Sequence, residues 1–351
     1  MIRRKATVGV AAIGVVAGAV ALGFVAAPAG AGQSPTLPPT TPAALVQSVL
    51  TAKLPAMSGT VEIDNNLGLP SVPGLPAQAA NGNSQIRVWT DGDDRTRIAI
   101  PGASSEQTVV DTGSTVYLWD STDRTVVEHS VRDGRAHAKQ QMDQRDIDPA
   151  TAARDLVGAV RATSTVTVDG TDVVAGRPAY DLVLTPKPDQ RTLLREVRIS
   201  VDAQTRMPLR LTVLSDNTDT PAIQVGFSSV SLGAQDPSLF TFTVPAGATV
   251  VNGDKNDDKP GKVADATRPT VVGNGWDTVL VAHVPTESSG STGPNEMLGL
   301  VKQFGTPVHG SWGSGWVVGT SVGNALITSD GRIAVGFVPQ QVLTQALGSA
   351  K

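Results

Sequence analysis

The side chains that most often carry catalysis or bind metals are scarce in this sequence. It contains no cysteine and four histidines: His129, His137, His283 and His309. No two histidines are four residues apart, and none stands at the spacing from a carboxylate that zinc sites use. The absence of cysteine also excludes disulfides, thiolate ligands and cysteine nucleophiles. We therefore expect no metal, no cofactor and no catalytic residue.

The acidic stretch "DKNDDKPGKVAD" comes nearest to a metal-binding motif. Positions 1, 3, 5 and 12 of a calcium loop would be Asp254, Asn256, Asp258 and Asp265. Position 6, which needs glycine for a sharp turn, is Lys259, and no pair of helices is predicted beside it. Because charged Gly/Pro runs are typical of linkers, a solvated linker is the better interpretation.

The stretch that begins at Gly313 is similar to the opening strands of trypsin-like proteases in its content of glycine and β-branched residues. Such a protease needs a histidine soon afterwards and a nucleophilic serine far downstream. No histidine follows His309, and only 15 residues follow Gly336. We therefore reject this reading.

The N-terminus has the layout of a secretory signal. A basic run is followed by an apolar stretch from Ala6 to Ala27 and by a small-residue site that ends at Ala31. An uncleaved N-terminal anchor is the alternative, because the apolar stretch is long enough to span a bilayer. In either case the protein is expected outside the cytoplasm, in the cell envelope or secreted.

The net charge argues against nucleic-acid binding. Without the three basic residues of the leader, the chain has 25 basic and 32 acidic residues.

We predict that residues 1–31 are removed on export. The intact mass of the secreted protein should then match a chain that begins at Gly32, because cleavage follows the small residues. A secreted form that retains Met1, or a protein found only in membranes, would contradict cleavage.

The remaining chain is predicted to contain two folded parts. A Pro/Thr-rich tether (32–41), too polar and proline-rich to pack, precedes a main domain (42–251). That domain begins with a helix from Pro42 to Leu54 and continues as short strands joined by Gly-, Asp- and Pro-containing turns, with a second short helix from Pro149. A polar linker (252–274) leads to a small C-terminal α+β appendage (275–351). Short turns between successive strands favour an antiparallel meander with one apolar face.

The stretch "REVRISVDAQTRMPLRLTVL" alternates almost without interruption. Val197, Ile199 and Val201 fall on one side of a strand, and Glu196, Arg198, Ser200 and Asp202 on the other. After the break "AQTR" the pattern resumes with Leu209, Leu211 and Val213. The stretch is therefore a hairpin with one apolar face, which covers either an ordinary core or a cavity.

Three runs of the sequence resemble the LolA/LolB/LppX-like superfamily and its relative RseB. They are the Gly-x-x-x-Tyr strand from Gly176 to Tyr180, the "VDAQT…PLR" hairpin from Val201 to Arg210, and "DPSLFTFTVPAGA" from Asp236 to Ala248. The most similar members are secreted LolA-like proteins of high-GC Gram-positive bacteria. The resemblance covers roughly residues 41–251 and implies a curved, unclosed antiparallel half-barrel whose open side is covered by helices.

In related proteins the concave side of this half-barrel holds the acyl chains of lipids or lipoproteins. The resemblance therefore implies a non-enzymatic carrier with an apolar cavity between the sheet and the first helix. We expect Leu50 and Leu54 on the covering helix, and as wall residues Trp89, Trp119, Tyr180, Leu182, Ile199 and Leu211. The alternatives are a filled core and an RseB-like module in which half-barrel and appendage contact a membrane-bound partner.

Overall fold

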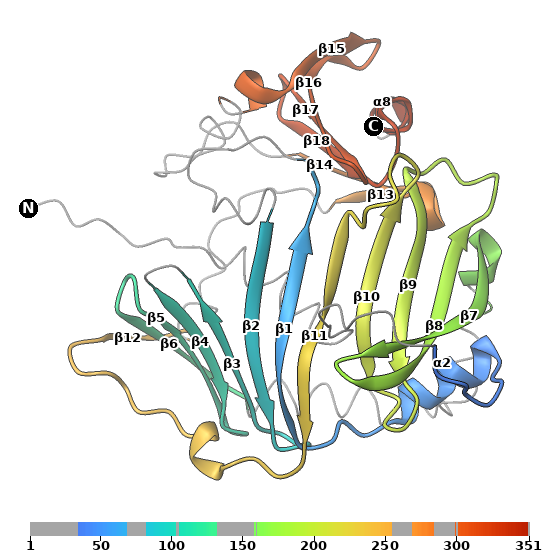
Figure 1. The fold of residues 1–351 in the computed structure, drawn as a ribbon. Coiled ribbons are helices and arrows are strands. Elements are labelled where there is room, and N and C mark those ends of the chain that lie inside the picture. Colours follow the sequence, from blue (N-terminus) through green and yellow to red (C-terminus); the bar gives the residue numbers. More distant parts are fainter. Residues whose placement is uncertain are drawn as a thin grey trace, which may run out of the picture.

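The computed structural model in Figure 1 describes residues 34–68, 82–102, 105–131, 158, 160–254, 269–283, 299 and 301–349. Several expectations from the sequence lie wholly or mostly outside these residues: the leader, the second helix from Pro149 and the acidic stretch after Asp254. No helix in the described part of the chain is long and apolar enough to span a bilayer.

The larger sheet has twelve strands in the order β12-β6-β5-β4-β3-β2-β1-β11-β10-β9-β8-β7. Every neighbouring pair is antiparallel except β12 and β6, which are parallel. The order is linear, so the sheet is not closed, and Figure 1 shows it as a strongly curved surface. The predicted unclosed, mainly antiparallel half-barrel is confirmed. Its strands are β1 (Met57–Asn65), β2 (Gly82–Thr90), β3 (Thr96–Pro101), β4 (Glu106–Asp111), β5 (Thr115–Asp120), β6 (Thr125–Ser130), β7 (Ser164–Val174), β8 (Arg177–Pro186), β9 (Leu194–Asp202), β10 (Pro208–Ser215), β11 (Ile223–Leu232) and β12 (Thr249–Asn252).

The smaller sheet belongs to the C-terminal part of the chain and has six antiparallel strands in the order β13-β14-β18-β17-β16-β15. Helix α8 (Gln340–Ser349) packs on one face of this sheet through Val342, Leu343, Ala346 and Leu347. This arrangement is the α+β appendage that the sequence predicts. Its strands are β13 (Thr270–Val272), β14 (Val279–His283), β15 (Thr306–Gly310), β16 (Gly313–Gly319), β17 (Asn324–Thr328) and β18 (Arg332–Gly336).

The turn between β7 and β8 explains one of the glycines in the family-like pattern. Val174 pairs with Arg177, so the loop between them has only two residues, Ala175 and Gly176. Both have positive φ, 50° and 75°. A two-residue loop of this kind matches the right-handed twist of a hairpin, and glycine adopts the conformation without steric cost.

Helix α2 (Pro42–Thr51) begins as the sequence predicts and ends earlier. The Thr41 hydroxyl accepts a hydrogen bond from Ala44 N (3.2 Å), and Pro42 occupies the first helical position. The helix ends at Thr51, three residues before Leu54. In Figure 1 it lies beside β7 and β8, at one edge of the large sheet.

Residues 34–41, which we call the strap, are packed against the sheet, so the prediction of an unpacked tether is wrong for them. Thr171 Oγ1 donates to the carbonyl oxygen of Pro35 (2.7 Å), and the Tyr180 hydroxyl donates to that of Pro38 (2.9 Å). Leu37 packs against the same cluster as helix α2. Proline-rich chain loses little conformational entropy when it docks in an extended form, so a few such contacts hold it.

The two sheets are joined by direct contacts. Leu194 and Ala222 of the large-sheet domain form a buried cluster with Val322 of the C-terminal domain, and Trp276 packs against it. The Trp276 indole N–H donates to Ser164 Oγ (2.6 Å), and the backbone joins Ser321 N to Leu67 O (2.9 Å) and Leu193 N to Phe337 O (2.9 Å). The C-terminal domain is therefore docked on one end of the half-barrel.

The domain boundary remains a prediction, and limited proteolysis tests it. We expect a first cut near Asp257, since an acidic Gly/Pro run is a poor packing segment. Because of the contacts above, the two fragments should co-elute on native size exclusion and separate in denaturant. The Trp276→Ala variant should release the C-terminal fragment more readily. Resistance near Asp257 together with cuts inside the strands would contradict the boundary.

Candidate functional site

The candidate site is the face of the large sheet on which helix α2 packs, here called the inner face. Directly paired residues share a face of a sheet, so the register identifies its members. One row crosses five neighbouring strands, β8, β9, β10, β11 and β1, and every member is apolar: Leu182, Ile199, Leu211, Val225 and Ile63. The predicted apolar face of the β9–β10 hairpin thus continues over its neighbours.

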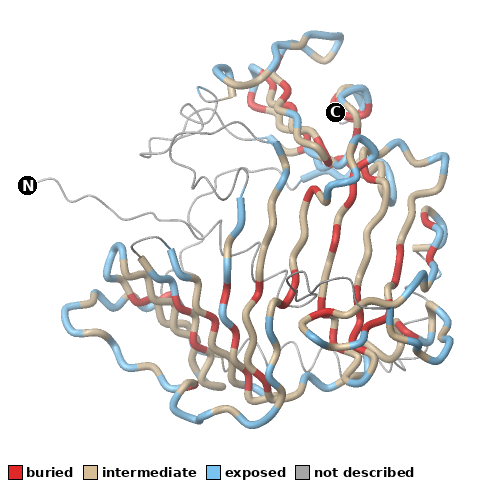
Figure 2. Tube along the Cα trace, in the orientation of Figure 1, coloured by how far each residue is buried: buried red, intermediate tan, exposed pale blue. Residues whose placement is uncertain are grey.

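A second row continues the inner face toward the other edge of the sheet. It crosses β2 to β6 and again contains only apolar residues: Val88, Ile98, Val109, Leu118 and Val127. Val88 and Ile98 are buried, whereas the last three are only partly buried. Figure 2 shows how buried and partly buried positions alternate along these strands.

Among the described residues, helix α2 covers one end of this apolar face. Leu45 is 1% exposed and belongs to a cluster with Val166, Tyr180, Leu182 and Val201. Along the first row, Ile199, Leu211, Val225 and Ile63 are partly buried. The middle of the inner face also belongs to a buried cluster, in which Val61 and Phe227 pack with Met207. The inner face is therefore apolar throughout these rows, packed at one end and in its middle, and only partly buried elsewhere.

The structure separates the eight residues that the sequence predicts for a cavity. Tyr180, Leu182, Ile199 and Leu211 lie together on the inner face. Trp119 pairs with Thr108, and this row continues through Ala99 and Arg87 to Thr60, on the opposite, outer face. Trp89 lies two residues from Arg87 and shares that outer face. The prediction that both tryptophans line the same wall is thus corrected: a shift of one residue decides the face.

The two leucines that were expected to cover the cavity are instead exposed to solvent. Leu50 is 48% exposed, and Leu54 is 40% exposed and follows the end of the helix. Leu50 is five residues from Leu45, which turns it about 140° away around the helix axis. The residue that meets the sheet is Leu45, and substitutions at Leu50 should therefore report little about the inner face.

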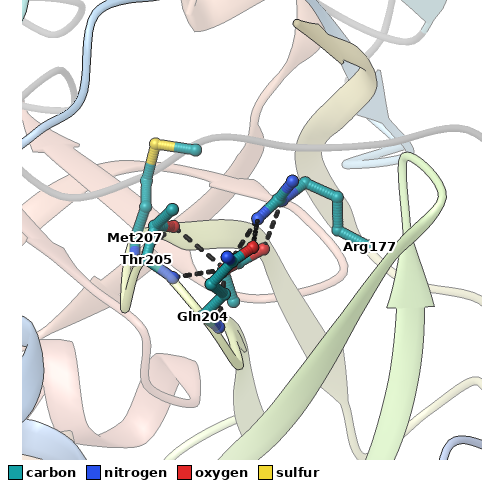
Figure 3. A network of polar contacts seen from close by, with 5 residues as sticks. Arg177, Gln204, Thr205 and Met207 are labelled. Carbon is teal, nitrogen blue, oxygen red and sulfur yellow. Dashed lines mark hydrogen bonds and ion pairs between the residues drawn. The ribbon is translucent and has the colours of Figure 1, made fainter. Parts of the chain in front are cut away.

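One polar network stands out because its acceptor is almost completely buried. The Asp202 side chain, 1% exposed, accepts hydrogen bonds from Arg177 Nε (2.5 Å), Thr205 N (2.6 Å) and Gln204 N (2.8 Å) (Figure 3). Burial alone would raise the pKa of Asp202, but these hydrogen bonds outweigh it, and the pKa lies below its ordinary value. The network fixes the β9–β10 turn against β8 and does not face the inner surface.

The pKa of a second carboxylate, that of Asp181, is shifted in the opposite direction. Burial raises the pKa of Asp181, and a hydrogen bond from Ser200 Oγ (2.6 Å) offsets this only in part. A folded-state pKa above the unfolded value means that the protonated carboxyl contributes stability at low pH, which is lost as pH rises through the folded pKa.

We predict that Asp181→Asn raises the unfolding midpoint at pH 7, because the variant buries no charge there. The difference in unfolding midpoint between the variant and the parent should become smaller on acidification. It should vanish below about pH 3, where Asp181 is neutral in both the folded and the unfolded state. Urea unfolding at several pH values measures it. A variant that is less stable than the parent at pH 7 would show that the carboxylate is needed.

The sequence also contains one match to the nucleophile pattern of α/β-hydrolases. Residues 319–323 read Gly-Thr-Ser-Val-Gly, a G-x-S-x-G match centred on Ser321. Such an elbow joins a strand to a helix, whereas this segment joins the antiparallel strands β16 and β17. The Ser321 hydroxyl donates to Asn66 O (3.1 Å) in the contact between the two domains. Among the described residues, no group of three or more His, Cys, Asp or Glu side chains could hold a metal ion.

Comparison with known proteins gives similarities of structure only. No protein-family model and no curated sequence matches the chain. The structure of the MucA/MucB complex of Pseudomonas aeruginosa matches over 86% of this chain and 94% of the matched chain, with 17% identity and a TM-score of 0.42. A LolA superfamily protein from Nitrosomonas europaea matches over 58% of this chain and 99% of its own, with 12% identity and a TM-score of 0.24.

A MucB protein and a LolA superfamily protein are thus among the solved structures to which this chain is similar. With identities this low, no functional residue of a LolA or MucB protein is transferred to this chain.

Proposed function

We propose that this chain is an exported, non-enzymatic binding protein whose inner face takes up acyl chains of a lipid or lipoprotein. The observation that carries the proposal is the pair of apolar rows, each of which crosses five neighbouring strands. The two rows are offset between β1 and β2, where Ile63 pairs with Ser84 and Val88 with Gly59. Leu182, Val88 and Ile98 are buried, and the other seven members of the two rows are only partly buried. The partly buried members leave apolar surface that an apolar ligand could cover.

Simple energetics support an acyl chain as the occupant. Each methylene removed from water contributes about 0.8 kcal/mol, so ten methylenes would give about 8 kcal/mol before the cost of association. No charged partner is required for such binding.

The alternative is an RseB-like module that contacts a membrane-bound partner. A specific observation favours it: the smaller sheet has an apolar row on the face opposite α8, formed by Val271, Leu280 and Val335. Their side chains are 62%, 48% and 45% exposed. An exposed apolar row on a domain docked to the half-barrel is typical of a protein contact surface.

Native mass spectrometry of the secreted protein distinguishes these functions. A carrier should retain a co-purifying lipid or bind a fluorescent fatty-acyl probe with saturation. The competing filled core would give a bare mass and no probe binding, because well-packed apolar faces leave no room for a ligand. That result would overturn the carrier proposal and leave the protein-contact alternative.

A further inference from the structure

A second candidate site lies on the outer face of the large sheet, away from the apolar rows. It is a groove of about 240 Å³ over β1, β2 and β11. Its polar lining consists of Ser58, Thr60, Arg87, Trp89, Ser229 and Ser231. The groove therefore combines hydroxyl groups, one guanidinium and one indole.

The groove arises from an irregularity in the pairing of β1 with β11. Thr60 pairs with Ser229 and Val61 with Phe227, so Ser228 is an extra residue. Gly59 allows this arrangement, because a Cβ there would stand 2.4 Å from the Phe227 ring. Bulges of this kind redirect side chains and are common beside binding sites. Here the floor of the groove consists of serine and threonine, with the larger Arg87 and Trp89 along one side.

The donors that line the groove are not used within the described structure. Arg87 is exposed and makes no hydrogen bond or ion pair with another described residue. Neighbouring arginines differ: Arg95 pairs with Asp91 (2.6 Å), and Arg97 donates to Leu239 O (3.4 Å). The described residues likewise provide no hydrogen-bond partner for the Trp89 indole N–H or for the Ser229 and Ser231 hydroxyls.

We propose that this groove binds an acidic sugar, with the sugar carboxylate on Arg87. The planar guanidinium fork matches a carboxylate with two parallel hydrogen bonds. The indole of Trp89 offers a flat apolar face for the C–H side of a sugar ring, and its N–H is a further donor. Serine and threonine hydroxyls both donate and accept, which suits a polyhydroxylated ligand.

The size and charge of the groove restrict the class of ligand further. Its volume is below the range of about 300–1,000 Å³ for drug-sized ligands, so one sugar ring is the expected occupant. A single arginine suits one negative charge. Glu62 lies two residues beyond Thr60 on the same face, where it accepts a hydrogen bond from Gln85 Nε2 (3.1 Å). Its carboxylate repels a doubly charged phosphate about twice as strongly as a singly charged sugar carboxylate.

The test is a titration of the isotope-labelled mature protein, followed by amide and indole NMR signals, with glucuronate, glucose and acetate as probes. We expect saturable shifts at Thr60, Ser229 and the Trp89 indole with glucuronate, and binding at least tenfold weaker for glucose and for acetate. Arg87→Gln and Trp89→Leu should each weaken glucuronate binding by about tenfold or more, since each removes one of the specific contacts. Arg195→Gln, which removes another arginine of the sheet far from the groove, is the matched control.

Several results would overturn the proposal. Absence of saturable shifts with glucuronate, or equal affinity for glucose, removes the acidic-sugar assignment. Equal affinity for acetate would reduce the site to a simple carboxylate contact. Unchanged glucuronate binding in Arg87→Gln would show that Arg87 does not hold the carboxylate. Because Arg87 is exposed, this substitution is expected to leave folding intact even if Trp89→Leu does not.

Discussion

Replacing Asp202 with alanine should lower the free energy of unfolding by about 3–5 kcal/mol, the cost of breaking a buried ion pair by removing one partner. The Arg177 guanidinium would lose its carboxylate, and the N–H groups of Gln204 and Thr205 would lose their acceptor. Urea or thermal unfolding measures the loss. Asp202→Asn, which keeps one oxygen acceptor, should fall between the parent and the alanine variant.

The pH dependence of this effect has a definite sign. The pKa of Asp202 is lower in the folded protein than in the unfolded chain. Its contribution is therefore fully present above the unfolded pKa and is lost as pH falls through the folded pKa. The matched control is Asp219→Ala, because Asp219 pairs with Arg195 (2.8 Å) but its side chain is 99% exposed. That variant should change stability little. Equal losses in the two variants would refute the special role of the Asp202 network.

Placing a carboxylate on the inner face should abolish most acyl binding. Val225 is the fourth of the five residues in the first apolar row, between Leu211 and Ile63. In Val225→Asp, an acyl chain could cover the row only by removing the new charge from water, which is strongly unfavourable. We expect the affinity for a fluorescent fatty-acyl probe to fall about 100-fold, equivalent to about 2.7 kcal/mol.

The adjacent residue provides the control for this experiment. Gln224 precedes Val225 on β11, so its side chain lies on the outer face, and Gln224→Asp adds the same charge there. Both variants are compared for probe affinity and for unfolding midpoint. Equal probe affinity in the two variants would show that the inner face is not the binding surface. Loss of affinity in Val225→Asp with a retained unfolding transition would support it.

The alternation of a strand was enough to predict which residues share a face where one face is apolar and the other polar, but not what covers each face. Ile199 and Leu211 lie together because side chains on a strand repeat every two residues. Trp119 could not be assigned in this way, since "TVYLWD" has large side chains on both faces. In the structure both are covered in part: Leu118 belongs to the second inner row, and Tyr117 stacks on Phe242 at 4.9 Å.

Other features depend on contacts between distant parts of the chain. The strap was predicted to be unpacked because its composition is typical of linkers, yet Tyr180 and Thr171 supply hydrogen-bond donors for its proline carbonyls. The outer groove depends on a bulge between β1 and β11, which lie far apart in the sequence. The Asp202 turn did carry a local signal, since Asp often accepts hydrogen bonds from backbone N–H groups two or three residues later.

If the chain is exported and its leader cleaved as predicted, the docked strap also bears on the order of these events. The predicted cleavage site at Ala31 is only four residues from Pro35, whose carbonyl accepts a hydrogen bond from the sheet, a reach of about 14 Å when fully extended. A peptidase that acts at the membrane surface would meet the folded edge of β7 and β8 at that distance. Processing should therefore be fastest while the strap is still undocked, so that maturation precedes completion of folding. A leader retained past that stage would instead hold this edge of the half-barrel against the bilayer.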